Sequence, residues 1–279
     1  MVDSNAVPAI HPTAIVDSRA ELAPDVRVDA YAVIEGRVII GAGSRIRSHS
    51  VVQGHTVIGA RCTIGPGAYV GLDPQHLKFD GSETSLIIGD EVVIREAASV
   101  HRSFKPGGEH ATRIGDGCFL MATSHVAHDC RLGNHVVMAN GTMLGGHVTV
   151  GERVFIGGGT GIHQFCQVGR LAMLSGNEPI SRDIPPFSAV KSGGLKGYNA
   201  IGCRRAGIPQ ASIHALRRAF KLLHENRTTP AAVNAIRNSP DAEVIEVAEL
   251  LSFIAGSRRG LQPSVRWVTA MNRCADDDD

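Results

Sequence analysis

Aliphatic side chains recur at every sixth position along most of the first two-thirds of the chain. The series runs over Ile10–Val70, Ile88–Val100 and Ile114–Ile180, with an aliphatic residue or methionine at each step. An amphipathic helix would repeat near 3.6 residues and an alternating strand near two, so neither pattern explains a period of six. A hexapeptide repeat is typical of a parallel β-helix, in which each hexad forms one short strand and one corner.

A second position of the repeat, four residues after the aliphatic one, favours small side chains. Alanine, serine or threonine stands there at Ala14, Ala20, Ala32, Ser44, Ser50, Thr56 and Ala68. Four of the six cysteines share this position, namely Cys62, Cys118, Cys130 and Cys166. A small residue at each step suits a second inward-facing site at a tight corner. We therefore interpret these cysteines as small buried hydrophobes rather than as disulfide partners or zinc ligands.

The repeat also predicts the outline of the first domain. Three hexads per turn make a triangular prism, in which residues 18 apart stack on successive coils about 4.8 Å apart. The two interruptions, at about 71–85 and 104–113, are expected to be loops that leave the prism at its corners. The repeat ends near Pro185–Pro186, so a β-helix domain is predicted over residues 1–190.

The remaining residues, 191–279, show a helical period instead. Apolar residues recur three and four apart over Ile213–Leu223, Ala232–Ile236 and Val244–Ile254. This pattern predicts three helices that pack as a small C-terminal domain. The acidic run Asp276–Asp279 at the end of the chain is expected to be disordered, because like charges repel one another.

Composition narrows the classes of function. The 28 basic and 27 acidic residues give a net charge of +1, so no bulk field favours nucleic acid. Aromatic residues make up 4% of the chain, whereas glycine occurs 32 times, which suits closely stacked, repetitive backbone. The sequence shows neither a cleavable signal nor an apolar run near the roughly 18–20 residues that span a bilayer. We therefore expect a cytoplasmic protein without membrane insertion.

The segment SHVAHDC, Ser124–Cys130, places two histidines three residues apart, with an aspartate after the second. His128 and Gly146 are 18 residues apart, as are Asp129 and His147, so each pair is expected to stack on neighbouring coils. Other polar residues expected along this edge are His125 on the neighbouring corner and His163 and Gln164 one to two coils further along.

Three interpretations of this motif compete. A histidine at a corner is most often a solvated polar residue, and the others of this phase are His49, His55 and His135. A zinc site needs three converging ligands, and His125 and His128 have no obvious third partner. A general base fits His128, with Asp129 as its orienting acid, because a neutral imidazole can take a proton from a hydroxyl near neutral pH. The backbone N–H of Gly146 could then hold an oxyanion.

Several motifs, in this order, resemble one known family. HVAHDCRLGN, GGHV, GGGTGIHQF and RDIPPF, with the earlier HPTAIVD and QHLKFDG, are similar to the acyl-carrier-protein-dependent UDP-N-acetylglucosamine O-acyltransferases of lipid A biosynthesis. The resemblance covers nearly the whole chain. It implies a left-handed parallel β-helix with C-terminal helices, assembled as a homotrimer with active sites between subunits. It also implies transfer of a 3-hydroxyacyl chain from acyl carrier protein to the sugar 3-hydroxyl, the first step of lipid A biosynthesis, without a metal or bound cofactor.

The resemblance assigns roles residue by residue. His128 matches the general base, Asp129 its hydrogen-bonded neighbour, and Gly146 the backbone donor to the oxyanion. Gly176 matches the position that sets acyl length, and glycine there is associated with longer chains. The positions that match substrate contacts are Gln75, His76, Lys78, His125, His147, His163, Gln164, Asn199 and Arg205. The dipeptide His101–Arg102 matches one in the middle coil of the family.

Three positions depart from the family pattern. His76 stands where the family usually has an aspartate, Ile201 replaces a glutamate, and Ala206 replaces a second arginine. Because the chemical residues are intact and acceptor contacts differ, the alternative is a related acceptor, such as a 3-amino sugar or a different nucleotide. A trimeric protein that binds a ligand or scaffolds partners, without catalysis, is a further alternative.

The C-terminal domain also carries a group of basic residues: Arg204, Arg205, Arg217, Arg218, Lys221 and Arg227. Solvated helix faces would account for them. Alternatively, these basic residues form an electropositive patch that docks the acidic acyl carrier protein and steers its approach.

Overall fold

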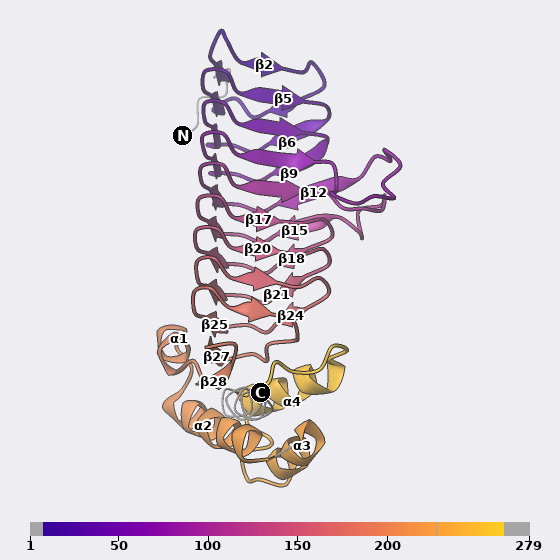
Figure 1. Cartoon of the computed structure of the whole chain (residues 1–279). Coiled ribbons are helices and arrows are strands. Elements are labelled where there is room, and N and C mark those ends of the chain that lie inside the picture. Colours follow the sequence, from indigo (N-terminus) through magenta and orange to yellow (C-terminus); the bar gives the residue numbers. More distant parts are fainter. Residues whose placement is uncertain (1–7, 227, 265–279) are drawn as a thin grey trace, which may run out of the picture.

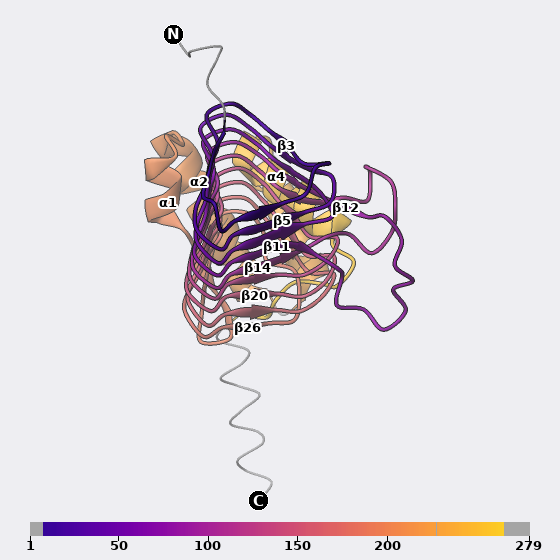
Figure 2. The same cartoon turned by 90° about the horizontal axis from the view of Figure 1, so that it is seen from above.

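The computed structural model describes residues 8–226 and 228–264 and shows a prism of stacked coils followed by helices (Figure 1). The prism consists of three sheets of eleven, nine and eight strands, designated sheets A, B and C. Each turn of the chain adds one strand to each sheet, and neighbouring coils pair in parallel. Seen from above, the chain winds left-handed around a triangular cross-section (Figure 2). The predicted left-handed parallel β-helix is confirmed.

Almost all strands are two to four residues long, as expected of hexads. Sheet A contains β1 (Ala9–Ile10), β4 (Arg27–Val28), β7 (Arg45–Ile46), β10 (Thr63–Ile64), β13 (Val93–Ile94), β16 (Phe119–Leu120), β19 (Val137–Met138), β22 (Phe155–Ile156), β25 (Met173–Leu174), β27 (Ser188–Lys191) and β28 (Gly194–Tyr198). Sheet B contains β2 (Ile15–Val16), β5 (Val33–Glu35), β8 (Val51–Gln53), β11 (Tyr69–Leu72), β14 (Ser99–His101), β17 (His125–Val126), β20 (Met143–Leu144), β23 (Gly161–Ile162) and β26 (Pro179–Ile180). Sheet C contains β3 (Glu21–Leu22), β6 (Val38–Ile40), β9 (His55–Ile58), β12 (Ser85–Ile88), β15 (Thr112–Ile114), β18 (Arg131–Leu132), β21 (Thr149–Val150) and β24 (Gln167–Val168).

The sixth-position series forms the core of the prism. From Val28 to Ile180 every member is buried, whereas the first three members lie half-buried or exposed at the N-terminal end. The thiol at the small position of several coils donates to a carbonyl of the next coil, as Cys130 does to Gly145 at 3.2 Å. Burial raises the pKa of the Cys130 thiol to about 12, so this thiol stays protonated. The four cysteines at the small position are free and buried, as the repeat predicted, and Cys203 in helix α1 is also free and buried.

The corners are tight turns whose second residue adopts a left-handed backbone conformation. At the corner between sheets B and C, designated the B/C corner, these residues include Asp129 (φ 59°), His147 (φ 60°) and Phe165 (φ 65°). His135 (φ 56°) has the same place at the C/A corner. Both interruptions of the repeat, residues 73–84 and 102–111, run from a strand of sheet B to one of sheet C. They therefore leave from the B/C corner, and Figure 1 shows them projecting from one side of the prism.

Within the described residues, four helices follow the prism: α1 (Ala200–Arg205), α2 (Gln210–Glu225), α3 (Thr229–Arg237) and α4 (Ile245–Gly256). The last three are the predicted helices, and their shared core includes Leu216, Phe220, Ile236, Leu250 and, from the end of the prism, Phe187. Helix α1 was not predicted, because six residues that include Gly202 are too few to show a helical period. The acidic run Asp276–Asp279 lies outside the described residues. Among the helices in the described ranges, none has the length and hydropathy needed to cross a membrane.

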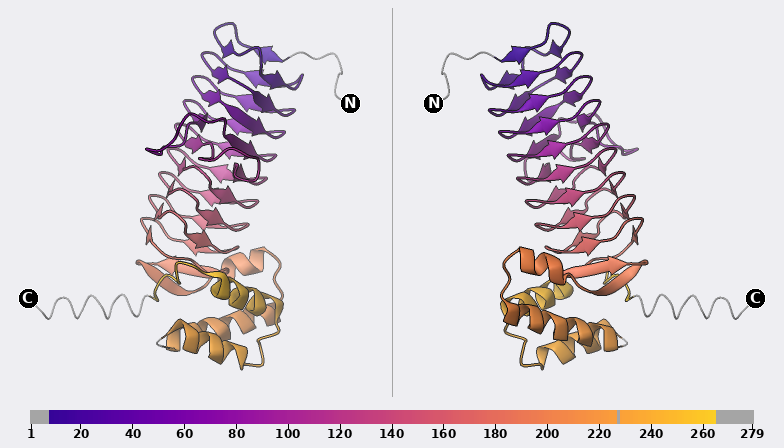
Figure 3. Two further views of the ribbon diagram at one scale, coloured as in Figure 1. Left: turned by 90° about the vertical axis from the view of Figure 1, so that its right-hand side faces the viewer. Right: turned by 90° about the vertical axis from the view of Figure 1, so that its left-hand side faces the viewer.

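A β-hairpin that the repeat did not predict closes the C-terminal end of sheet A. Strand β27 pairs in parallel with β25, whereas β28 pairs antiparallel with β27. Glu178 occupies the small position four residues after Leu174, in the hexad before the last. Its buried carboxylate accepts hydrogen bonds from the backbone N–H groups of Ser192 (2.8 Å) and Gly193 (2.7 Å) at the hairpin turn. These bonds satisfy a charge that would otherwise be costly to bury, and Figure 3 shows the hairpin between the prism and the helices.

Candidate active site

His128 and Asp129 form the turn between β17 and β18 at the B/C corner. The Nδ1 atom of His128 lies 2.6 Å from Oδ2 of Asp129, and both side chains are about nine-tenths buried. Because a carboxylate can only accept, His128 donates from Nδ1 and keeps Nε2 as an acceptor. The backbone N–H of Asp129 donates to Thr112 Oγ1 at 2.8 Å, which fixes the turn. This is the arrangement of a general base with its orienting acid.

Gly146 lies on the coil that follows His128, as the 18-residue spacing predicts. The backbone N–H of His147 donates to the carbonyl of His128 at 3.0 Å, which holds the two coils in register. A Cβ atom on Gly146 would lie 2.9 Å from Nε2 and 2.8 Å from Cε1 of His128. Glycine therefore makes room for the imidazole, and the accepting nitrogen of His128 faces the Gly146 backbone.

Aromatic rings surround His128 on two sides. His147 lies edge-on to it, with ring centres 5.2 Å apart, and stacks on Phe165 at 4.5 Å. His76, from loop 73–84, also lies edge-on to His128, at 5.6 Å. Phe104, from loop 102–111, lies 4.2 Å from the His76 ring and 6.1 Å from the His128 ring. The base thus lies between rings of its own corner and rings of both loops.

The surroundings keep Asp129 ionised and His147 neutral. Burial acts to raise the pKa of Asp129, but hydrogen bonds from His128 and from the backbone N–H of Phe104 outweigh it and lower that pKa below its usual value. Burial lowers the pKa of His147, against the attraction of Asp129. The 3.8 Å between His147 Nε2 and Asp129 Oδ2 therefore joins a neutral ring to a carboxylate rather than two opposite charges.

A second pair of histidines lies on sheet B beside this corner. The prediction that His125 lies on a corner is wrong: it is on strand β17, because the residue before each aliphatic position belongs to the strand and faces outward. Its Nδ1 lies 2.8 Å from Ser99 Oγ, and its ring lies 5.2 Å from that of His101. His101 Nδ1 donates to the Asp73 carbonyl at 2.6 Å, at the root of loop 73–84. Burial, and then the charge of His101, lowers the pKa of His125 to about 4, so it is neutral at neutral pH.

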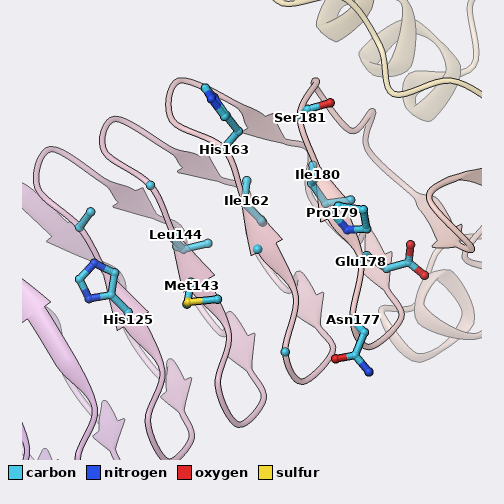
Figure 4. A pocket seen from close by; sticks show the side chains of 14 residues that line it. His125, Met143, Leu144, Ile162, His163, Asn177, Glu178, Pro179, Ile180 and Ser181 are labelled. Atoms are coloured by element: carbon cyan, nitrogen blue, oxygen red, sulfur yellow. The ribbon is translucent and has the colours of Figure 1, made fainter.

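A groove of about 650 Å³ runs over sheet B next to His125 (Figure 4). Its floor consists of the outward-facing residues of four successive coils, in register: His125, Met143, Gly161 and Pro179. A Cβ atom on Gly161 would meet nothing within 4 Å, so the groove is open there. His163 lines the edge nearest the B/C corner. The groove is mostly apolar and begins beside the B/C corner that carries His128.

Other predicted residues lie around this centre. Gln164 forms the corner after His163, whose Nδ1 lies 3.1 Å from the Gln164 carbonyl. Gln75 and Lys78 are exposed on loop 73–84, the loop that also carries His76. Gly176 lies at the corner between sheets A and B. Loop 73–84, with its predicted residues, therefore starts at the B/C edge of sheet B, whereas Gly176 lies at the opposite, A/B edge of that sheet.

Asn199 and Arg205 are not brought to His128 within one chain. Asn199 caps helix α1: its Oδ1 accepts from the Gly202 N–H at 2.9 Å, and its Nδ2 donates to the Leu171 carbonyl at 2.8 Å. Leu171 belongs to the C/A corner. Figures 1 and 2 place α1 on the side of the prism away from the two loops. Arg205 ends the same helix.

His128, Asp129 and His147 are also the group of side chains in the described ranges that could hold a metal ion, with ligand atoms within 4.8 Å of one another. A tetrahedral zinc with bonds of about 2.0–2.2 Å needs ligand atoms about 3.3 Å apart. The 2.6 Å between His128 and Asp129 is shorter and is the length of a strong hydrogen bond. These distances favour the acid–base interpretation of the three residues.

Two aromatic residues of the site were not predicted from the sequence. Phe165 lies 18 residues after His147, so the stacking rule that linked His147 to Asp129 could have found it. Phe104 lies in an interruption of the repeat, where no phase applies, and it reaches Asp129 through its backbone N–H at 3.0 Å. No pattern in the sequence marks that contact.

The prism, its corner residues and its helices define a class of protein. The hexapeptide repeat of bacterial transferases matches residues 19–54 and 111–146, which makes the chain a member of the hexapeptide-repeat class. Domain 2 of UDP-N-acetylglucosamine O-acyltransferase matches residues 183–262. An acyl-[acyl-carrier-protein]–UDP-N-acetylglucosamine O-acyltransferase of Anaeromyxobacter dehalogenans (strain 2CP-1) is 40% identical over 255 residues, which is 91% of this chain and 99% of the relative. The protein belongs to the family of these O-acyltransferases.

Two further relatives support this membership. The O-acyltransferase of the same name from Rhizobium etli is 39% identical over 206 residues, or 73% of this chain and 75% of the relative. The structure of LpxA from Acinetobacter baumannii is 38% identical and superposes with a TM-score of 0.84, covering 90% of this chain and 98% of the other.

Proposed function

We propose that the protein transfers a 3-hydroxyacyl chain from acyl carrier protein to the 3-hydroxyl of UDP-N-acetylglucosamine, the first step of lipid A biosynthesis. The observation that carries this proposal is the His128–Asp129 pair, whose free Nε2 faces Gly146 between two loops and beside an apolar groove. The names of the relatives, which specify acyl carrier protein and UDP-N-acetylglucosamine, support the two substrates.

With the acyl thioester and the sugar as its two substrates, the His128–Asp129 pair can carry out acyl transfer without a further reactant. Nε2 of His128 takes the proton of the sugar hydroxyl as its oxygen attacks the thioester carbonyl carbon. The carbonyl oxygen becomes negative, and the backbone N–H of Gly146 donates to it. When this intermediate collapses, the C–S bond breaks and the departing thiolate takes the proton from His128. Asp129 holds the ring in position and stabilises the imidazolium. The proton that His128 takes is the one it returns, so the cycle closes on the chain's own residues.

The groove on sheet B suits the acyl chain. It begins at His125, next to the catalytic corner, and continues over Met143 and Gly161 to Pro179, so the chain can lie along the prism axis on apolar side chains. The resemblance places control of acyl length at Gly176, whose neighbour Asn177 lines the groove. We expect a larger residue at Gly176 to shorten the preferred chain.

Mass spectrometry of acyl transfer tests the proposal directly. The protein is incubated with 3-hydroxyacyl carrier protein and equal amounts of UDP-N-acetylglucosamine and its 3-amino analogue. We expect O-acylated UDP-N-acetylglucosamine as the main product. Acylation of the amino analogue alone would overturn the assigned acceptor, and binding of a nucleotide sugar without any acylated product would support the non-catalytic alternative.

We further propose that the protein is a homotrimer with composite sites. The outward residues of sheet A are apolar on five successive coils: Val93, Phe119, Val137, Phe155 and Met173. Phe155 and Met173 remain 40% and 37% exposed in one chain, as an unpartnered face would be. On sheet C the residues in the equivalent places are polar: Arg113, Arg131, Thr149 and Gln167. Packing sheet A of one copy against sheet B of the next would bring Asn199 and Arg205 to the neighbour's catalytic corner.

Complementation between variants tests the composite site. Trimers of His128→Ala alone and of Arg205→Ala alone are expected to have little activity. Co-expression lets one subunit supply His128 and its neighbour supply Arg205, so roughly a quarter of the sites in random trimers should be intact. Mixed trimers no more active than the parents would show that each site is built from one chain.

A basic cavity on helix α2 suits acyl carrier protein. It has a volume of about 860 Å³ and is lined by Lys196, His214, Arg217, Arg218 and Lys221. Arg218 and Lys221 are engaged by neighbouring carboxylates, so Lys196 and Arg217 are the cations of this lining that have no ion pair within the described ranges. We expect Arg217→Glu to raise KM for the acyl carrier protein at low salt. KM for a short acyl-pantetheine thioester, which lacks the acidic protein, should not change.

A further inference from the structure

Phe104 joins the catalytic pair to both loops of the B/C corner. Its backbone N–H donates to Asp129 Oδ2 at 3.0 Å, the same oxygen that accepts from His128 at 2.6 Å. Its half-buried ring lies 4.2 Å from the ring of His76 at an angle of 45°. One residue of loop 102–111 therefore contacts the orienting acid and also the loop that carries the predicted sugar contacts.

The backbone on both sides of Phe104 is held in place. The buried guanidinium of Arg102 pairs with Asp73 and donates to the Gly71 carbonyl at 2.9 Å, which ties loop 102–111 to the root of loop 73–84. The hydroxyl of Ser103 donates to the Lys105 carbonyl at 3.1 Å. The Ser103 backbone N–H pairs with sheet C, donating to the Ser85 carbonyl at 3.1 Å. The Phe104 amide is thus positioned before any substrate arrives.

His76 presents a donor rather than an acceptor to whatever binds beside His128. The backbone N–H of Lys78 donates to His76 Nδ1 at 3.2 Å. In the neutral ring this leaves the proton on Nε2. The aspartate expected at this position by resemblance would only accept hydrogen bonds. The ring of Phe104 packs against His76, so the two side chains form one wall with an aromatic face and an N–H donor.

We propose that Phe104 is a positioning residue with two roles, and this inference rests on the proposed function. Its backbone N–H donates to Asp129 Oδ2, the oxygen that also accepts from His128. This second hydrogen bond fixes the carboxylate and so keeps Nε2 of His128 directed at the acceptor hydroxyl. The Phe104 ring, with His76, forms the wall against which the sugar ring of the acceptor lies. Aromatic faces are a common lining for such polar rings, because the negative face attracts their C–H groups.

Two substitutions separate these roles. Phe104→Leu keeps the amide and the apolar bulk but removes the ring. We expect it to weaken binding of UDP-N-acetylglucosamine, measured by titration calorimetry, about three- to tenfold, with little change in kcat or in KM for the acyl donor. Phe104→Pro removes the amide hydrogen as well. It should also lower kcat, about 10- to 100-fold, because a misaimed base is costly.

Controls make the outcome specific. Phe79→Leu removes a ring of the same size from the same pair of loops, one ring further from His128, and should leave acceptor binding unchanged. Phe104→Tyr keeps the ring and should restore wild-type binding. Wild-type acceptor affinity in Phe104→Leu would overturn the wall, and equal kcat in the leucine and proline variants would overturn the amide's role. Calorimetry needs no turnover, so a protein that binds the sugar but transfers nothing would count against the proposed function and not against Phe104.

Discussion

His147 and His135 occupy equivalent places in the repeat, yet the two differ completely in their surroundings. Both have a left-handed backbone, with φ of 60° and 56°, and both follow an aliphatic core position by three residues. His147 is half-buried between His128 and Phe165 at the B/C corner, whereas His135 is exposed at the C/A corner. The backbone conformation of the repeat is therefore the same at the B/C corner, which carries the candidate site, and at the C/A corner, which does not.

The loops make the difference between the two corners. Both interruptions of the repeat leave from the B/C corner, and they place His76 and Phe104 over His128. Burial lowers the pKa of His147 there, whereas hydrogen bonds from His128 and from the Phe104 backbone outweigh burial and lower the pKa of Asp129. The hexads fix where the corner side chains lie, and the two loops that interrupt the hexads determine which side chains surround His128.

The largest expected effect comes from a change in the core that both corners share. Val126 is fully buried next to the turn that carries His128, so Val126→Asp would bury an unpaired charge at a cost of several kcal/mol. We expect no folded protein by circular dichroism and size-exclusion chromatography. Thr149→Asp, on the outward side of sheet C, is the control and should fold normally. Soluble, folded Val126→Asp protein would mean that the side chain does not point into the prism.

The next effect compares the two corners directly. His128→Ala should lower kcat about 10²–10⁴-fold, because the general base is lost. His135→Ala should leave kcat and the melting temperature unchanged, because that side chain is exposed. His128→Ala also removes a hydrogen bond from the buried Asp129 and should lower the melting temperature. The measurement is steady-state kinetics with one fixed acyl donor. Activity of His128→Ala within a few-fold of the parent would remove His128 from the mechanism.

A smaller effect tests the space beside the base. Gly146→Ala puts a Cβ atom 2.8 Å from the His128 ring, which forces the ring to move. We expect kcat to fall about 10- to 100-fold through misplacement of Nε2. Gly256→Ala, at the end of helix α4, where a Cβ atom meets nothing within 4 Å, is the control and should retain kcat. Equal activity in the two glycine variants would show that the imidazole position is not limiting.

The smallest effect concerns the acid stability of sheet B at His125, beside the B/C corner. The pKa of His125 in the folded protein is about 4, below its unfolded value of about 6.5. Above pH ~6.5 the ring is neutral in both states, so it contributes no pH dependence. As pH falls from ~6.5 to ~4, the unfolded chain binds the proton first, and the free energy of unfolding decreases.

His125→Gln removes this term. Urea unfolding between pH 7 and pH 4 should therefore show a shallower loss of stability than in the parent. Asp129, whose pKa is lowered, loses its own contribution at lower pH, below about 4, so the two windows are separate. An unchanged slope between pH 6.5 and 4 in His125→Gln would contradict a neutral, buried His125.

The repeat predicted most of the fold because each hexad has the same pattern of inward-facing residues. One aliphatic residue and one small residue per hexad sufficed to place the strands, the buried cysteines, and the stacking of Gly146 beside His128. The hairpin of β27 and β28 was beyond this reasoning. It depends on the buried carboxylate of Glu178. This residue is an exception at the small position, and it binds a turn 14 and 15 residues further along the chain.

The site was predictable where it follows the repeat and unpredictable where it depends on the loops. The pairing of His128 with Asp129 follows from adjacent corner positions. The contact of Phe104 with Asp129 does not, because it is made by a backbone N–H whose direction depends on the whole path of loop 102–111. Asn199 and Arg205 were named by resemblance, and their distance from His128 in one chain appears only when α1 is seen on the other side of the prism.

The cap at Glu178 has a consequence for association between molecules. A stack of parallel strands ends in unpaired backbone groups, and such an edge is a template for adding further chains. At the C-terminal end the hairpin turns sheet A back on itself and Glu178 holds the turn closed, with the helices beyond it. Endless head-to-tail growth needs an open edge at both ends of every molecule. The carboxylate that satisfies two N–H groups therefore also closes the C-terminal edge of sheet A to the addition of a further strand.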